Sequence, residues 1–522
     1  MNIQYPNHIN VAQLDSSRAF DCDVVICGTG AGGGVAAEIL TQAGYKVIML
    51  EEGPLKRSSD FDMQEKTAYA TLYQEAAGRK TKDKAINILQ GRAVGGSTTV
   101  NWTSSFRTPQ KTLEYWSDNF HIKDILYENM EPWFIRMEQR LNISPWASPA
   151  NENNTILARG AKALSLTPKV IPRNVNGCIN LGYCGTGCPI NAKQSMLVST
   201  IPTALESGAT LLSCCRAQKI LTEKDKAIGV KAFAINKYGK LKKDIVITVH
   251  AAKVIVAGGA INSPALLLRS KLPDPYRTLG KRTFLHPVSL VTGIMPKPVN
   301  AFSGAPQSVY VDDLLWRDGV TGKVGYKLET APMHPLLAST VFLNHGSHHY
   351  DIMQKFPYMQ ASLALLRDGF NDDSVGGEVT LDKYDYPVLD YPITDYIWEG
   401  IQHSWLTMTE LLFAAGAKHV IPLHLDSSIY SSWDKARQAI KKLPLKKLRA
   451  QVASAHVMGG CTMGGDINNS VVDSHGRYHH VKNLFVFDGS LFPTSIGANP
   501  QLSIYALIAK LTNNLIQSDS LK

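Results

Sequence analysis

Cysteine is scarce in this sequence, with 8 residues in a chain of 522. So few thiols do not make a disulfide scaffold in a chain of this length, and a reducing cytoplasm is the expected location. Residues 1–23 lack the charged start, apolar middle and small-residue cleavage site of a signal peptide. No run of about 18 apolar residues predicts a transmembrane helix, and internal repeats are missing as well. These absences exclude disulfide-rich secreted domains, membrane-spanning proteins and solenoids.

Charged residues are also few, at 19% against the roughly 25% typical of soluble chains, which favours a large buried core. The net charge of +10 is spread along the chain without a nucleic-acid-binding motif, so no nucleic-acid partner is expected. The densest basic stretch, residues 441–449, is interpreted as a solvated surface, with weak contact to a membrane surface as the less favoured alternative. The length predicts two domains or one large intertwined pair.

The stretch near the C-terminal end predicts a strand, a loop and a helix. The apolar run 484–487 reads as a buried strand, which the turn residues Asp488 and Gly489 stop. Asn499 is suited to cap the helix and Pro500 to occupy its first position. Because a helix N-terminus offers free N–H groups and partial positive charge, it can hold an anion or a group that becomes anionic during a reaction. The alternative is an ordinary capped helix without a ligand.

A dinucleotide-binding pattern lies near the start of the chain. The apolar run 24–27 is followed by Gly28-Thr-Gly30-Ala-Gly-Gly33, a helical stretch, and a second apolar run that ends at Glu51. Gly28 is expected to form the tight turn, Gly30 to let the backbone approach a pyrophosphate, and Gly33 to allow close helix–strand packing. Glu51 is placed to accept hydrogen bonds from a ribose. The pattern does not distinguish FAD from NAD, and its alternative is a glycine-rich turn that binds nothing.

Two further glycine-rich stretches follow. Residues 91–102, Gly-Arg-Ala-Val-Gly-Gly-Ser-Thr-Thr-Val-Asn-Trp, are typical of a backbone that approaches a flat or phosphorylated ligand, although a surface loop is the alternative. Residues 254–264 read as a strand and a glycine turn, with Ser263 before Pro264 capping a helix over 265–269. That strand is expected to join the sheet of the first motif as a further parallel strand.

Four elements together resemble the glucose–methanol–choline (GMC) oxidoreductase family. They are the Gly28 motif, residues 91–101, residues 258–264, and the C-terminal part that begins at His456, and their order and spacing match over nearly the whole chain. The stretch 178–195 is similar to the long-chain alcohol oxidase or cholesterol oxidase-like branch of that family. The central residues 300–450 carry the least recognisable pattern.

The resemblance implies an α/β fold with two domains. A Rossmann-like FAD-binding domain with a parallel sheet is expected from residues 20–55, 86–105, 195–290 and 450–522, and a substrate domain from residues 56–85, 106–194 and 291–449. In this family an antiparallel sheet of the substrate domain covers the flavin. The strands predicted at 376–382 and 387–392 fit that role, and a long helix is predicted over 397–415.

The resemblance also implies FAD-dependent oxidation of an alcohol to the carbonyl, in which hydride passes to flavin N5 and a base takes the hydroxyl proton. His456 matches the family's catalytic histidine, and an unperturbed histidine titrates near pH 6.5. Asn499 matches the second catalytic group, and as asparagine it hydrogen-bonds the substrate oxygen but does not take a proton. The helix at Pro500 is expected to point its N-terminus at the flavin. His286 and His475 have no such match and are expected to be structural.

Further matches outline the cofactor site. The residues expected to contact FAD are Gly28, Gly30, Gly33, Glu51, Arg92, Gly95, Gly96, Ser97, Asn101, Gln218, Gly258, Asp488, Gly489 and Pro500. Some family members attach the flavin through a histidine in the glycine–serine stretch, and the matching Val100 has no nucleophilic atom. FAD is therefore expected to bind non-covalently.

Cys178, Cys184 and Cys188 are expected to lie close together. Their spacing matches no trusted iron–sulfur or zinc motif, and no fourth local ligand is evident, so no metal site is predicted. Reduced thiols fit a cytoplasmic protein best. A redox-active disulfide is the intermediate alternative, and a metal completed by the pair Cys214-Cys215 is the least favoured.

Several alternatives to an alcohol oxidoreductase stay open from the sequence. They are an FAD-containing lyase without net redox change, an NAD-dependent dehydrogenase, and a non-catalytic flavoprotein or membrane-surface binding module. Aromatic residues between 302 and 398 are either ordinary core or the lining for an aliphatic or sterol-like substrate, so the expected partner is a small, apolar alcohol. The electron acceptor is expected to be oxygen, a quinone or a redox protein.

Overall fold

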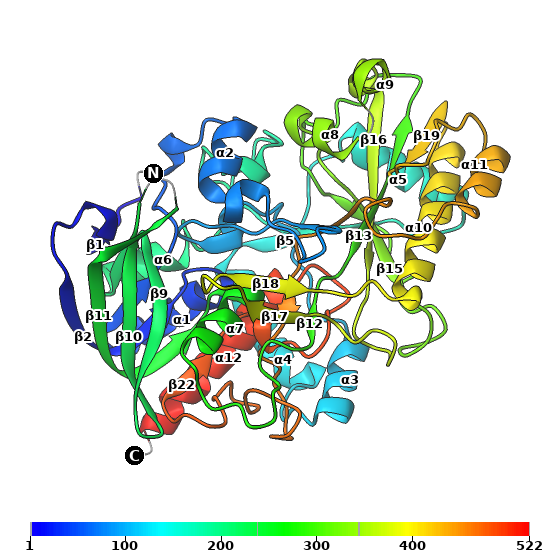
Figure 1. Ribbon diagram of the computed structural model, residues 1–522. Helices are drawn as coiled ribbons and strands as arrows, with labels where there is room; N and C mark the ends of the chain where they lie inside the picture. Colours follow the sequence, from blue (N-terminus) through cyan, green and yellow to red (C-terminus); the bar gives the residue numbers. More distant parts are fainter. Residues whose placement is uncertain (1–2, 237–238, 343–344, 521–522) are drawn as a thin grey trace.

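The computed structural model describes residues 3–236, 239–342 and 345–520, and Figure 1 shows them as two packed units side by side. One unit is built on an eight-stranded sheet and the other on a six-stranded sheet. The α-helices are α1 (Ala31–Gln42), α2 (Glu65–Leu72), α3 (Gln110–Phe120), α4 (Tyr127–Arg140), α5 (Glu152–Ala163), α6 (Thr200–Glu206), α7 (Gly259–Arg269), α8 (Pro335–Val341), α9 (Gly346–Met353), α10 (Asp395–Ala414), α11 (Trp433–Ile440) and α12 (Gln501–Ser520).

The eight-stranded sheet has the order β1-β8-β3-β2-β11-β10-β9, with β22 also paired to β11. Its strands are β1 (His8–Asn10), β2 (Arg18–Cys27), β3 (Val47–Leu50), β8 (Thr210–Ser213), β9 (Cys215–Glu223), β10 (Lys226–Ile235), β11 (Leu241–Val256) and β22 (Leu484–Val486). Strand β2 pairs in parallel with β3 and with β11, which confirms the predicted parallel strand at 254–256. Strands covered on both faces read as continuous apolar runs, as β3 and the end of β2 do.

Helix α1 lies against this sheet and against α12 and α6 because its first turn carries glycine instead of larger residues. A Cβ at Gly32 would lie 1.8 Å from the carbonyl oxygen of Phe487, which follows β22. A Cβ at Gly34 would lie 2.9 Å from Cβ of Met196. Small residues at these positions therefore let the N-terminus of α1 approach both the end of β22 and the segment before α6.

Helix α7 begins at Gly259, six residues earlier than the sequence predicts, and Pro264 lies inside it. Ser263 is not a cap: its Oγ accepts from the backbone N–H of Gly258 (2.8 Å) and donates to Asp488 Oδ2 (2.5 Å). The same carboxylate accepts from the N–H of Gly259 (2.7 Å) and so satisfies a donor at the helix start. This partner comes from a segment far along the chain, so the local sequence did not reveal it.

The six-stranded sheet has the order β15-β16-β13-β20-β4, with β19 paired to β13. Its strands are β4 (Ile86–Ile88), β13 (Val288–Ile294), β15 (Tyr326–Thr330), β16 (Met359–Leu366), β19 (His419–Pro422) and β20 (Val452–Ser454). All pairs are antiparallel except β20 with β4. Helix α10 packs on this sheet and confirms the long helix predicted over 397–415.

The two strands predicted at 376–382 and 387–392 are present, but they do not join the six-stranded sheet. They form the separate hairpin β17 (Glu378–Leu381) and β18 (Pro387–Asp390), which packs on α7. They are therefore not part of that antiparallel sheet, because alternation and a turn identify a hairpin without saying which sheet it joins. The other short pairs are β5 (Ile143–Pro145) with β7 (Pro172–Asn174), β6 (Lys169–Val170) with β14 (Val309–Tyr310), and β12 (Thr283–Phe284) with β21 (Met458–Gly459).

Helix α12 begins one residue later than the sequence predicts, and its first intrahelical bond runs from the N–H of Ile504 to the carbonyl of Pro500 (3.0 Å). The helix, drawn in red in Figure 1, runs from the middle of the molecule toward the lower left and packs on α1 and α4. The predicted cap at Asn499 is wrong, since the hydrogen bonds of its side chain within the described residues go to Lys327 and Glu329. A buried ion pair from the other unit competes successfully for this amide.

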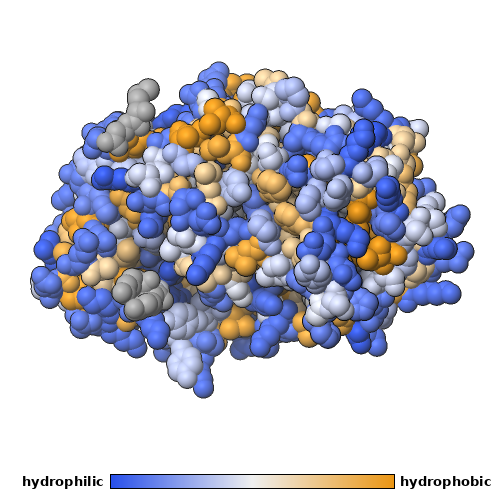
Figure 2. Space-filling view, turned by 90° about the horizontal axis from the view of Figure 1, so that it is seen from above, coloured by the Kyte–Doolittle hydropathy of each residue, from blue (hydrophilic) through white to orange (hydrophobic). Residues whose placement is uncertain are grey.

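The face of the molecule in Figure 2 is mostly hydrophilic, with hydrophobic residues gathered in small separate patches. None of the helices in the described parts of the chain is both long and apolar enough to cross a bilayer.

Candidate active site

The glycines of the first motif bring the end of β2, the start of α1 and the end of β11 into contact. Gly28 has φ +111°, and a Cβ there would lie 2.3 Å from the carbonyl oxygen of Ala257. A Cβ at Gly33 would lie 2.0 Å from the carbonyl oxygen of Gly28. Gly30 precedes α1 without a side-chain cap, so the first N–H groups of the helix point to a position suited to an anion.

The second motif packs directly on the first. Gly96 has φ +55°, and a Cβ there would lie 2.8 Å from Cα of Gly30. The N–H of Gly95 donates to Thr29 Oγ1 (3.1 Å), and Ser97 Oγ accepts from the N–H of residue 91 (2.9 Å). Two backbones without side chains therefore meet beside the N-terminus of α1, as close approach to a phosphate group requires.

Glu51 is buried at the end of β3 and holds the first motif together. Its Oε2 accepts from the backbone N–H of Thr29 (3.1 Å) and from Thr29 Oγ1 (2.6 Å), and its Oε1 accepts from the N–H of Gly53 (2.8 Å). Burial raises the pKa of Glu51 to about 7. A carboxylate has about four acceptor positions, so roughly one is left for a ribose hydroxyl.

Segments from the middle and the end of the chain complete the site. Asn101 Nδ2 donates to Gln501 Oε1 (2.6 Å), which joins the second motif to the first residue of α12. Asp488 Oδ1 accepts from the N–H of Ser490 (2.8 Å), while its Oδ2 holds the start of α7 beside Gly258. A Cβ at Gly489 would lie 3.0 Å from the side chain of Ile504 in α12. The expected contacts at 101, 258, 488 and 489 thus lie where three segments meet.

Arg92 and Gln218 each have a buried polar atom without a partner in the described part of the chain, Nε and Oε1 respectively. The guanidinium of Arg92 lies 4.0 Å from the carboxylate of Glu52. Within the described residues it makes no hydrogen bond with Gly96. An unpaired buried acceptor is unfavourable. Oε1 of Gln218 therefore fits a ligand that donates an N–H there, as the adenine amino group does.

These features fit FAD as the ligand. The bare backbones at Gly30 and Gly96 suit a pyrophosphate, Glu51 suits a ribose, and Gln218 suits adenine. Gly28, Gly30 and Gly258 also keep accessible surface although the strands that lead to them are buried. The residues that would hold FAD are therefore those of the three glycine-rich motifs and the segment after β22.

His456 and His286 form a stacked pair, with 3.1 Å between their Nδ1 atoms and 5.2 Å between their ring centroids. His286, which was expected to be structural, thus contacts the expected catalytic histidine. His286 is fully buried, and its backbone N–H donates to Asp368 Oδ1 (3.0 Å). One of the two Nδ1 atoms must carry a proton, since two bare nitrogens repel each other.

Burial lowers the pKa of both rings. That of His456 falls to about 3, with the positive charge of Lys327 acting in the same direction, and that of His286 falls well below its usual range. His456 as a residue keeps some accessible surface, and the exposed Ala455 precedes it. Both rings are thus neutral at physiological pH, and His456 has a nitrogen lone pair to offer.

Asn499 lies in contact with a buried ion pair on β15. Its Oδ1 accepts from Lys327 Nζ (2.6 Å), and its Nδ2 donates to Glu329 Oε2 (3.2 Å). Lys327 Nζ and Glu329 Oε1 are 2.8 Å apart, and both side chains are almost completely buried. Because the charge of Lys327 also acts on His456, the lysine connects the two expected catalytic residues.

One face of the six-stranded sheet lies toward the second motif. Residues paired directly across strands share a face, and the register places Lys327 opposite Leu365 and Leu365 opposite Val288. In the next row Glu329 lies opposite Leu363. Val288, Leu363 and Leu365 form a small apolar cluster against Trp102, separate from the main cores of both units. The sheet thus places an apolar surface, interrupted by one ion pair, beside the second motif.

The sequence did not reveal the contacts that His286, Lys327 and Glu329 make with His456 and Asn499. For the ion pair a signal was present: in Tyr-Lys-Leu-Glu-Thr the charged residues alternate with buried apolar ones, which puts both on one face of a strand. His286 carried no comparable signal, because its partner is distant in sequence. His475 lies in a turn, with its backbone N–H donating to Asp473 Oδ1 (2.9 Å), away from these residues.

Cys178, Cys184 and Cys188 line one pocket of about 20 Å³, so the expectation that they lie close together is confirmed. All eight cysteines are free. Arg173 Nη2 lies 3.7 Å from Cys184 Sγ, and Lys193 Nζ donates to the carbonyl of Cys184 (2.8 Å). Burial raises the pKa of the Cys184 thiol. Among the described residues, no group of three or more His, Cys, Asp or Glu side chains is arranged to hold a metal ion.

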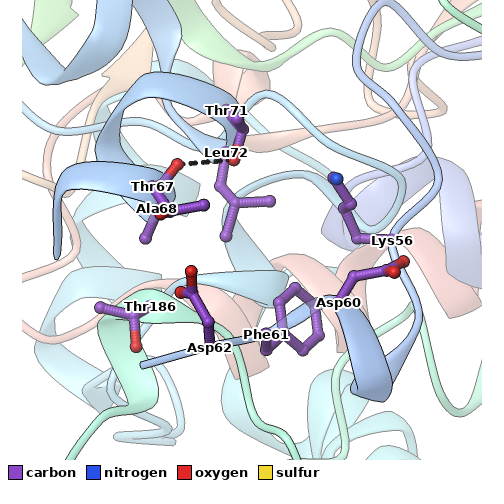
Figure 3. Close-up of a pocket in the computed structure, with 9 residues that line it drawn as sticks. All are labelled: Lys56, Asp60, Phe61, Asp62, Thr67, Ala68, Thr71, Leu72 and Thr186. Atoms are coloured by element: carbon purple, nitrogen blue, oxygen red, sulfur yellow. Dashed lines mark hydrogen bonds between the residues drawn. The ribbon is translucent and has the colours of Figure 1, made fainter. Parts of the chain in front are cut away.

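A second pocket lies beside α2 and measures about 10 Å³, the space of a single water. Figure 3 shows Lys56, Asp60 and Asp62 at its edge and the hydrogen bond from Thr71 to the carbonyl of Thr67. It is too small for an alcohol or a flavin, and none of the expected site residues lines it.

Comparison with known proteins gives consistent results. Family models described as GMC oxidoreductase match residues 69–288 and 372–507. The long-chain-alcohol oxidase FAO4A of Arabidopsis thaliana is 29% identical over 531 residues, covering 96% of this chain and 69% of the relative. An uncharacterized GMC-type oxidoreductase, y4nJ, of Sinorhizobium fredii is 29% identical over 512 residues, covering 97% of both chains.

Two solved structures share the fold. A formate oxidase of Aspergillus oryzae superposes with a TM-score of 0.70 at 15% identity, covering 97% of this chain and 99% of that chain. The pyridoxine 4-oxidase of Mesorbium loti superposes with a TM-score of 0.66 at 16% identity, covering 94% and 99%. At this identity the likeness concerns the fold alone.

Proposed function

Because this chain belongs to the GMC oxidoreductase family and is an FAD-dependent oxidoreductase of CH–OH donors, we propose that it oxidises an apolar alcohol to the carbonyl compound with His456 as general base. Bound FAD supplies the hydride acceptor at N5. The observation that carries the proposal is the 3.1 Å contact between the Nδ1 atoms of His456 and His286, beside the lysine that holds Asn499.

The histidine pair gives His456 the protonation state that a base needs. When His456 Nδ1 carries the shared proton and donates it to His286 Nδ1, His456 Nε2 is left with a free lone pair. Nε2 then accepts the hydroxyl proton of the alcohol, and the Nδ1–H bond continues to hold the ring in place. In this arrangement His286 carries its own proton on Nε2, the buried nitrogen that has no partner among the described residues.

The apolar cluster of Val288, Leu363 and Leu365 against Trp102 supports an apolar alcohol as the substrate. The relative named a long-chain-alcohol oxidase supports the same class. Of the aromatic residues between 302 and 398, Trp398 packs in α10 and Trp316 lies beside Arg367. The substrate is thus expected to lie along the sheet face that carries the cluster.

The test is anaerobic reduction of the bound flavin, followed by its absorbance, with ethanol, 1-octanol and cholesterol as reductants. We expect 1-octanol to reduce the wild type, and His456→Ala to lower the rate about 10²- to 10⁴-fold, the usual contribution of a positioned base. The matched control is His475→Ala, a histidine in a turn outside the site. Both variants should keep FAD. A wild-type rate in His456→Ala excludes this base, and no reduction by any alcohol favours a lyase.

We also propose that oxygen, a quinone or a redox protein reoxidises the flavin in the cytoplasm, where reduced thiols are stable. The free cysteines support this location. Weak contact with a membrane surface through residues 441–449 would bring an apolar alcohol or a quinone within reach. Mixing the reduced protein with air or with a soluble quinone, and sedimenting it with anionic vesicles, tests these points.

A further inference from the structure

A buried ion pair lies in the site and has no role in the reaction proposed above. Lys327 and Glu329 are two residues apart on β15, so their side chains leave the sheet on the same face. Their neighbours across the strands are Leu365 and Leu363. A charged pair in such apolar surroundings is weak evidence for stability, because apolar residues of similar size often serve the fold as well. Its contacts therefore deserve a functional explanation.

The pair fixes the orientation of the Asn499 amide. An ammonium group only donates and an ionised carboxylate only accepts. Oδ1 must therefore face Lys327 (2.6 Å), and Nδ2 must face Glu329 (3.2 Å). The reverse orientation would place an NH₂ group against the ammonium and a carbonyl oxygen against the carboxylate. The two charges thus exclude the flipped amide, which a neutral pair would tolerate.

Lys327 Nζ is enclosed by three neighbours. It donates to Asn499 Oδ1 (2.6 Å), forms an ion pair with Glu329 Oε1 (2.8 Å) and lies 3.4 Å from the centre of the Phe106 ring. The Nδ2 group of Asn499 has two N–H donors. One donates to Glu329, which leaves the second for another acceptor. The group that can reach a substrate oxygen is therefore the second N–H of Asn499.

We propose that Lys327 and Glu329 act together as positioning residues that hold the Asn499 amide in the one orientation that presents an N–H to the substrate oxygen. This inference rests on the proposed alcohol oxidation. It assigns to the pair no proton transfer and no contact with the substrate. The positioning passes through Asn499, whereas the charge of Lys327 also lowers the pKa of His456 and would change the pH profile instead. This makes the positioning separable by experiment from a general loss of stability.

The first experiment measures flavin reduction by 1-octanol under anaerobic conditions in the double variant Lys327→Met/Glu329→Leu. Replacing both charges avoids leaving one of them buried and unpaired, so the fold should persist. We expect the rate at saturating 1-octanol to fall about 10- to 100-fold, the scale of a misplaced catalytic contact. The matched control is Lys323→Met/Asp318→Leu, an exposed ion pair (3.8 Å) of the same unit, which should leave the rate unchanged.

Non-additivity separates positioning from structural damage. Asn499→Ala alone should slow reduction, and adding Lys327→Met/Glu329→Leu to it should change the rate less than about twofold, because residues that act through one another do not add. A double variant that reduces at the wild-type rate overturns the proposal. So does a double variant whose loss multiplies with that of Asn499→Ala.

The second experiment uses unfolding by urea and does not depend on activity. Asn499→Asp should lower the midpoint, because the new carboxylate faces Glu329. Adding Glu329→Gln should raise it again, since Lys327 then pairs with Asp at 499, whereas Glu329→Gln in the wild type should lower it. If Glu329→Gln lowers the midpoint equally in the wild type and in Asn499→Asp, the ion pair does not hold the Asn499 amide in one orientation. A wild type that no alcohol reduces defeats the proposed function, and this cycle still decides the inference.

Discussion

Replacing Gly96 by alanine tests whether the contact between the two glycine-rich motifs builds the cofactor site. Gly96 has φ +55°, a left-handed conformation that costs an L-residue roughly 1–2 kcal/mol. Its new Cβ would also lie 2.8 Å from Cα of Gly30. Ordinary contact needs about 3.4 Å or more, so the two backbones must separate by roughly 0.6 Å. The variant should therefore lose stability through strain and lose FAD through the displaced motif.

Gly44→Ala is the matched control. Gly44 follows α1 with φ +89°, and a Cβ there meets nothing within 4 Å. Both variants should be destabilised by roughly 1–2 kcal/mol in urea unfolding. Only Gly96→Ala should bind FAD more weakly, by at least about tenfold, which corresponds to about 1.4 kcal/mol. The assay is flavin content after dialysis and quenching of flavin fluorescence on titration. Wild-type affinity in Gly96→Ala would refute the reasoning.

Three further predictions concern protons and the mode of attachment. Because the pKa of His456 is about 3, the base is neutral from pH 5 to 8, and flavin reduction at saturating alcohol should be nearly constant there; a midpoint near 6.5 in stopped-flow rates would contradict this. Because burial raises the pKa of Glu51 from 4.5 to about 7, its contribution to stability is present below about pH 4.5 and is lost as the pH rises through 7. The urea midpoint should thus fall from pH 5 to 8 more in the wild type than in Glu51→Gln. FAD should remain in the supernatant after acid precipitation, since Val100 has no nucleophilic atom, and flavin on the precipitated chain would show a covalent bond.

Local patterns of apolar residues in the sequence predicted much of the fold. The apolar runs of β2, β3 and β22 and the periodicity of α10 depend on neighbouring residues alone, so their positions followed from the sequence. The same holds for the glycines at 28 and 33, where the backbone conformation or packing leaves no room for a Cβ.

Partners that come from distant segments did not follow from the sequence. The start of α7 depends on Asp488, and the side chain of Asn499, which precedes α12, contacts a lysine and a glutamate on the six-stranded sheet. The hairpin of β17 and β18 was visible locally, but not its separation from the six-stranded sheet.

The sequence by itself determined that this protein has a dinucleotide-binding unit, because short motifs encode close backbone approach. It also led to the prediction that a histidine and an asparagine are catalytic, from the side-chain chemistry at positions that match the family. Only the tertiary structure decided the surroundings of those two residues. His286 reaches His456 from 170 residues away, and the ion pair reaches Asn499 from 170 and 172 residues away. The orientation of an amide and the tautomer of a ring depend on such contacts, since each is set by the donor or acceptor that packing places next to it.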